Sequence, residues 1–146
     1  MAPIFILAAC LFSQTGTTEY QEPAAEINWT TNTDAETFYN SNLRIPRLLA
    51  TPEWTSDQDN PPLSARKAIV AASGIMRKLA AYGKDTKLNP PTLKLRESNG
   101  RWFWVVYYSP NDWRQFNSTF PIVVLMDGTA IEPQRIPAPP LGLGDQ

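Results

Sequence analysis

Residues 99–110, NGRWFWVVYYSP, carry large apolar or aromatic side chains at seven consecutive positions between a turn and a proline. A strand with one face in water alternates apolar and polar residues, and this stretch does not alternate. Either another part of the chain covers the second face of the strand, or that face is a binding surface. The sequence leaves both alternatives open.

The aromatic strand forms one arm of a predicted hairpin. Residues 92–98 alternate leucine with lysine and arginine, which predicts a half-buried strand. The Asn-Gly pair at 99–100 indicates a two-residue type I′ turn, because both central positions of that turn need a positive φ. A turn of this length sets the register of the two strands and places Arg96 opposite Phe103.

The segment between Ser64 and Gly83 predicts the main helix. Apolar side chains recur there at steps of three and four residues, so they form one stripe. Ser64 suits the N-cap and Gly83 suits the C-terminal stop. The basic residues lie largely outside the stripe, and we expect a solvated face rather than a phosphate site. These basic residues are Arg66, Lys67, Arg77 and Lys78.

A second hairpin is predicted near the end of the chain. Residues 120–126 are apolar, and Asp127 and Gly128 follow as a turn signal. Residues 129–132 then return as a short strand that Pro133 stops.

These elements predict an α+β fold with one main helix packed on an antiparallel sheet of about four strands built from two hairpins. This domain covers residues 63–133. A linker and N-terminal segment over residues 19–62 precedes it, and an extended tail rich in proline and glycine follows over residues 134–146. Residues 1–18 are set apart as a leader.

The segment 19–62 holds too many apolar residues for a free linker, so we expect it to pack on the sheet. Thr33 and Glu36 fit a capping box and predict a short helix through Phe38 and Tyr39. If the segment covers the second sheet face, that face is core; otherwise it is an exposed patch. The apolar residues of the segment are Trp29, Phe38, Tyr39, Leu43, Ile45, Leu48, Leu49 and Trp54.

The leader predicts export. Residues 1–12, MAPIFILAACLF, form an apolar run without a charge that is too short to span a bilayer as a helix. LAAC at 7–10 resembles the lipobox of bacterial lipoproteins, which implies lipidation at Cys10. An unlipidated export signal and an ordinary apolar strand stay open as alternatives. We expect an extracytoplasmic location, in the periplasm, the envelope or the medium, with membrane contact only through a lipid anchor.

Composition removes several kinds of chemistry. The chain has no histidine, which excludes a His-dependent triad or a histidine-containing zinc site within it. A net charge of −1 gives no general attraction for nucleic acid, so we expect no nucleic-acid partner. We predict no catalytic residue, no metal site and no cofactor. Ser64 and Lys67 have the S-x-x-K spacing of a hydrolase dyad, but we expect Ser64 to cap the helix.

Three segments carry a family resemblance. They are LSARKAIVAA at 63–72, WFWVVYY at 102–108 and FPIVVLMDGTAIEP at 120–133. Their order resembles that of PepSY-like domains, which belong with the cystatin-like α+β group of bacterial envelope proteins. The resemblance implies a small extracytoplasmic module that binds or inhibits peptidases, and it carries over no catalytic residue.

The predicted function is therefore that of an exported, non-catalytic binding or inhibitory module with a protein or peptide partner. The candidate binding residues come from the second sheet face and from the loop after the aromatic strand. They are Lys94, Arg96, Phe103, Tyr107, Trp113 and Phe116. A structural or self-associating envelope protein is the alternative, and a hydrolase using hydroxyl and lysine groups is a third. The oligomeric state stays open.

Overall fold

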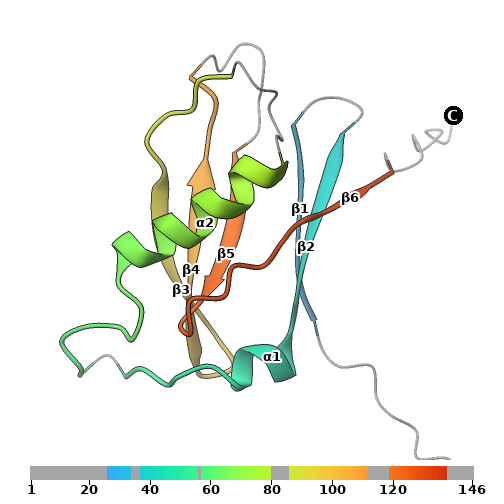
Figure 1. Cartoon of the computed structure of the whole chain (residues 1–146). Helices are drawn as coiled ribbons and strands as arrows, with labels where there is room; N and C mark the ends of the chain where they lie inside the picture. Colours follow the sequence, from blue (N-terminus) through green and yellow to red (C-terminus); the bar gives the residue numbers. More distant parts are fainter. Residues whose placement is uncertain (1–25, 34–36, 56, 80–85, 112–118, 138–146) are drawn as a thin grey trace, which may run out of the picture.

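The computed structural model describes residues 26–33, 37–55, 57–79, 86–111 and 119–137. Within these ranges the chain forms two antiparallel three-stranded sheets and two helices (Figure 1). We call the sheet with the strand order β3-β4-β5 the central sheet and the sheet with the order β1-β2-β6 the outer sheet. No helix in the described ranges is long and apolar enough to cross a membrane.

The central sheet contains β3 (Thr92–Ser98), β4 (Arg101–Tyr108) and β5 (Phe120–Leu125). The predicted first hairpin is confirmed. Its register pairs Arg96 with Phe103, and the two turn residues at 99–100 have φ values of 51° and 70°.

Helix α2 (Ala65–Leu79) covers one face of the central sheet. Ser64 caps it, because its Oγ accepts a hydrogen bond from the backbone N–H of Lys67 at 3.4 Å. The hydroxyls of Ser73 and Tyr108 lie 2.9 Å apart and link the helix to β4. Burial raises the pKa of the Tyr108 phenol, so it stays neutral and hydrogen-bonded within this interface.

The outer sheet begins with β1 (Glu26–Asn32) and β2 (Phe38–Arg44), and the short helix α1 (Ile45–Leu49) follows. The expected helix through Phe38 and Tyr39 is wrong, because these residues start β2. The period of the buried positions explains this outcome. Tyr39, Ser41 and Leu43 are buried in alternation, which a strand can achieve on one face and a helix cannot.

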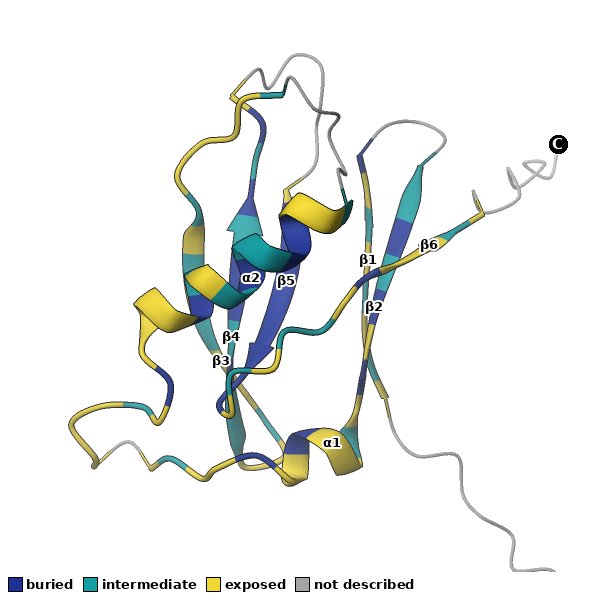
Figure 2. Ribbon diagram, viewed as in Figure 1, coloured by how far each residue is buried: buried dark blue, intermediate teal, exposed yellow. Residues whose placement is uncertain are grey.

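The outer sheet covers the second face of the central sheet, which answers the question raised by the aromatic strand. Phe103 is only 2% exposed, and the Trp29 ring meets it edge to face with 5.9 Å between centroids. Figure 2 shows β5 buried along its whole length between the two layers. The buried residues of this second core are Leu43, Leu48, Phe103, Val105, Val123 and Leu125. Both faces of the apolar strands are therefore core.

Residues 129–136, which we call the strap, join the two sheets. Its first part lies beside β5, where Ile131 donates its N–H to the carbonyl of Val123 at 2.8 Å. Its last part is β6 (Gln134–Ile136), which pairs antiparallel with β2. The chain thus crosses from one sheet to the other within a few residues (Figure 1).

The strap explains why the expected fold class, one main helix on a four-stranded sheet, is wrong. The return segment 129–132 makes only the isolated bridge between Ala130 and Val124 and forms no fourth strand of the central sheet. Residues 134–136, expected in an extended tail, complete the other sheet instead. The described chain is mostly β, with two sheets and two short helices.

Truncation of Leu43 tests the packing of the outer sheet on the central one. Leu43 is 1% exposed in the second core, so Leu43→Ala removes apolar contacts and leaves a cavity. We expect the free energy of unfolding in urea to fall by about 2 to 5 kcal/mol. Val70→Ala is the matched control, because Val70 is 65% exposed on α2 and its truncation should change stability by less than about 0.5 kcal/mol. Equal effects of the two substitutions would contradict this packing.

Candidate functional site

The structure separates the residues that the sequence grouped as a binding face. Phe103 is buried beneath the outer sheet, and Tyr107 is half-buried at the margin of the same core. Lys94 and Arg96 lie exposed on the edge strand β3, with the Lys94 Nζ 5.5 Å from the centroid of the Tyr107 ring. On the protein surface the four residues therefore form a narrow basic strip along the edge strand β3 rather than an open apolar face.

Three other candidates lie outside the described residues. These are Cys10 in the leader and the loop aromatics Trp113 and Phe116. Their predicted roles stay predictions.

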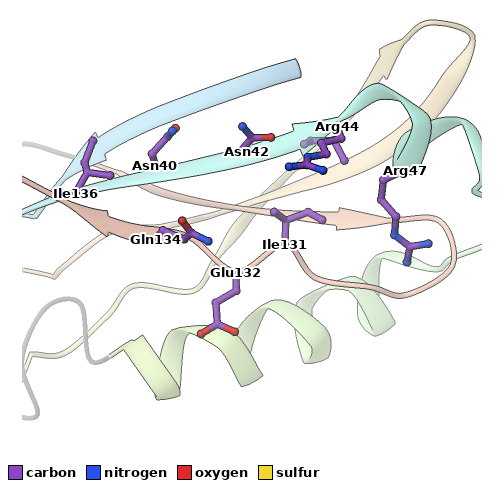
Figure 3. Close-up of a pocket in the computed structure, with 9 residues that line it drawn as sticks. Asn40, Asn42, Arg44, Arg47, Ile131, Glu132, Gln134 and Ile136 are labelled. Carbon is purple, nitrogen blue, oxygen red and sulfur yellow. The ribbon is translucent and has the colours of Figure 1, made fainter. Parts of the chain in front are cut away.

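A groove of about 540 Å³ lies between β2 and the strap (Figure 3). Amide, charged and aliphatic side chains line it in comparable proportion. Its lining residues are Asn40, Asn42, Leu43, Arg44, Arg47, Ile131, Glu132, Gln134 and Ile136. None of them belongs to the set that the sequence pointed to.

The groove follows the edge of β2 rather than one of its faces. Side chains alternate between the faces of a strand, so Asn40, Asn42 and Arg44 share the outer face while Leu43 lies on the inner one. A hollow lined from both faces must open along the strand edge. Leu43 and Ile131, which both belong to the second core, form its apolar floor.

Charges of opposite sign stand apart along the groove. Figure 3 shows Arg44 and Arg47 toward α1, whereas Glu132 projects from the strap on the side away from β2. Arg44 is 75% exposed and lies only loosely beside Glu26, with 3.7 Å between Nε and Oε1. At that exposure the pair stabilises the fold little, so the Arg44 guanidinium is available to a ligand.

Arg47 is held more firmly. Its Nη2 donates to the Asp127 carboxylate and to the Thr129 hydroxyl, each at 2.8 Å. Asp127 also accepts the backbone N–H of Thr129 at 2.9 Å. Partial burial tends to raise the pKa of the Asp127 carboxyl, but the hydrogen bonds from Thr129 and the nearby Arg47 guanidinium outweigh it and hold the pKa below its ordinary value. These contacts tie α1 to the start of the strap and close that end of the groove.

A second, more open hollow of about 640 Å³ lies between α2 and the turn at 127–128. Exposed Val70 borders it together with the basic residues Arg66 and Lys67. Helix α2 satisfies its own backbone groups, so this hollow presents side chains alone. The groove beside β2 borders a strand edge and has the richer chemistry for a ligand.

The described residues contain no cluster of three or more histidine, cysteine, aspartate or glutamate side chains that could hold a metal ion. Ser64 serves as the cap of α2, as described above, and Asp127 holds Arg47 and the turn. The arrangement offers hydrogen bonds and charge to a bound molecule.

Sequence reasoning missed the groove because it assigned Phe38 and Tyr39 to a helix. The alternation of Tyr39, Ser41 and Leu43 with Asn40, Asn42 and Arg44 was the available signal for a strand. Asparagine is depleted in strands, and this weakened the signal. The partner of that edge lies some ninety residues further along the chain, which no local pattern reveals.

No family model, curated protein or solved structure matches the chain. The groove therefore has to be interpreted from its own geometry.

The contacts of Asp127 give a stability prediction. Since the pKa of its carboxyl is lower in the folded than in the unfolded chain, the carboxylate stabilises the fold above its unfolded pKa. That contribution is lost as the pH falls through the folded-state pKa. We expect Asp127→Asn to lower the free energy of unfolding by up to about 1 kcal/mol near neutral pH, since Arg47 is partly exposed.

Urea unfolding near neutral pH and at about pH 2 measures this effect, and the difference between the two proteins should shrink at the acidic pH. Asp59→Asn, in an exposed stretch, controls for the loss of one negative charge. A difference that grows on acidification would refute the assignment.

Proposed function

We propose that the protein is a non-catalytic binding module whose ligand is a polypeptide segment held in the groove between β2 and the strap. The observation that carries the proposal is the place of this hollow, along a strand edge and between two extended segments. A polypeptide presents alternating side chains and a row of backbone amides, and a strand edge complements both.

The lining residues support a peptide in preference to a wholly apolar ligand. The side-chain amides of Asn40 and Gln134 each combine donors with an acceptor and can pair with a backbone amide, whereas the Asn42 amide already donates to the Glu26 carboxylate. Ile131 and Ile136, which are both half-buried, offer a small apolar surface for one or two side chains. The volume of about 540 Å³ suits a few residues of an extended chain and leaves the rest of the segment outside.

The proposal includes export of the protein, which the leader predicts. An apolar run at residues 1–12 and the lipobox-like residues 7–10 favour action outside the cytoplasm, with a lipid anchor at Cys10. The resemblance to PepSY-like modules favours a peptidase, or the peptide on which it acts, as the source of the bound segment. A structural, self-associating role is the alternative.

Selection from a random dodecapeptide library displayed on phage tests the binding function. We expect peptides that bind the full chain and lose about tenfold or more in affinity with Arg44→Glu, which reverses a charge inside the groove. Arg135→Glu is the matched control. Arg135 is an exposed arginine of β6 that pairs opposite Tyr39 and does not line the groove.

Both variants should unfold at the temperature of the parent protein, because each changes an exposed side chain. Failure to select any binder would refute the proposal. Peptides equally weakened by both variants would place binding elsewhere.

Export has a separate test in bacterial cells. If Cys10 is lipidated, mass spectrometry of the mature protein finds a diacylated or triacylated cysteine at its N-terminus, and the protein fractionates with membranes. Cys10→Ala should then release it from the membrane fraction. A mature chain that retains residues 1–9 in the cytoplasm would contradict the export proposal.

A further inference from the structure

The pairing of β6 with β2 defines where a continued strand would run. Ile136 pairs with Phe38 and Gln134 pairs with Asn40 in antiparallel register. Continuing this register would bring Glu132 opposite Asn42. The remainder of β2, Ser41–Arg44, would then be covered as far as α1.

The strap does not follow that course. On the N-terminal side of Gln134 the strap runs beside the central sheet instead. There the N–H of Ile131 bonds to the carbonyl of Val123, and the carbonyl of Thr129 accepts the N–H of Leu125 at 2.9 Å. Within the described ranges, no backbone hydrogen bond joins Ser41–Arg44 to the strap. Every second residue of this stretch therefore directs its backbone N–H and C=O groups toward the groove, without a strand to receive them.

We infer that the groove takes its peptide by strand addition: an extended segment pairs with the β2 edge at Ser41–Arg44 and extends the outer sheet. This inference rests on the proposed function and specifies its mode. The edge already accepts one extended segment, β6, over Phe38–Asn40, so the same strand geometry continues into the empty stretch. Four residues of edge extend for about 14 Å.

The exposed edge of β3 is less suited to strand addition than the edge of β2. Lys94, Arg96 and Glu97 stand exposed along it, and charged side chains on an edge strand oppose the approach of another strand. The β2 edge instead has buried Ser41 and the amide side chains of Asn40 and Asn42 beside it. Its only charge on the open stretch is Arg44 at the end.

The charges of the groove set a preference for the bound segment. Arg44 is exposed, whereas the neighbouring Arg47 is already paired with Asp127. An acidic side chain near the α1 end of the segment would meet Arg44, whereas Glu132 points away from β2 and sets no preference at the opposite end. The occupant is thus an extended segment of at least four residues with an acid at the Arg44 end.

The test uses the peptides selected on the full chain. Each backbone amide of a selected peptide is N-methylated in turn, which removes a donor and leaves the side chains unchanged. We expect alternating sensitivity, with affinity losses of about tenfold or more at the pairing positions and small losses between them. Amide hydrogen exchange should slow on binding at alternate residues within Ser41–Arg44.

Charge reversal provides the second arm. A peptide whose acid is replaced by lysine should regain affinity for Arg44→Glu, while Arg135→Glu keeps the preference of the parent protein. Both results together support strand addition with an acid at the Arg44 end.

Three outcomes overturn the inference, and they differ from one another. If no peptide is selected, the proposed function fails as well. If a peptide depends on Arg44 but tolerates N-methylation at every position, the groove binds peptides by side chains alone and only strand addition fails. If exchange at Ser41–Arg44 slows with protein concentration in the absence of peptide, the edge is occupied by a second copy of the chain.

Discussion

The hydrogen bond from the N–H of Ile131 to the carbonyl of Val123 holds the strap against the central sheet at this position. The arrangement of the outer sheet and of the groove depends on this contact. Because the strap is committed to β5 at this position, it reaches β2 only at Gln134. The outer sheet is therefore completed over three residues of β2 and left open over the next four. The same short segment closes the second core through Ile131 and creates the groove beside it.

The contacts of Arg47 hold the other end of this arrangement. Helix α1 follows β2 directly, and its arginine reaches the turn that begins the strap. Two connections, one at β6 and one at Asp127, thus set the separation between β2 and the strap. A groove held at both ends is preorganised, and ligand binding to it costs less conformational entropy than binding to a free loop.

Sequence reasoning succeeded where structure is decided by neighbours along the chain. The Asn-Gly turn at 99–100 determined the register of the first hairpin, and the three-to-four spacing after Ser64 determined α2. The seven apolar positions of β4 correctly raised the question of a second cover. The register of the hairpin and the helix depend on contacts within about fifteen residues, whereas the cover of β4 comes from a distant part of the chain.

Reasoning from sequence failed where distant segments meet. The return segment expected after Asp127 does lie beside β5, but it makes only one isolated bridge there, and residues 134–136 pair with β2 instead. No local pattern shows that the chain changes partner between these two segments. The capping-box residue Thr33 is buried directly after β1, and Phe38 and Tyr39 lie in β2, since tertiary burial of Tyr39 and Leu43 outweighs a weak helix signal. The groove was missed for the same reason: its two walls are separated by most of the chain.

The strap also has a consequence for the order of folding. The β1-β2 hairpin forms from residues made early, yet its sheet gains a third strand only when residues 134–136 are available. Until then the edge of β2 that faces away from β1 has no partner strand, and the second core lacks Ile131. Contacts between such distant segments slow folding, because a long loop must close before they can form. If the chain is exported as proposed, this delay is an advantage, because the chain stays incompletely folded, and so can be threaded through a membrane, until its last strand has been made.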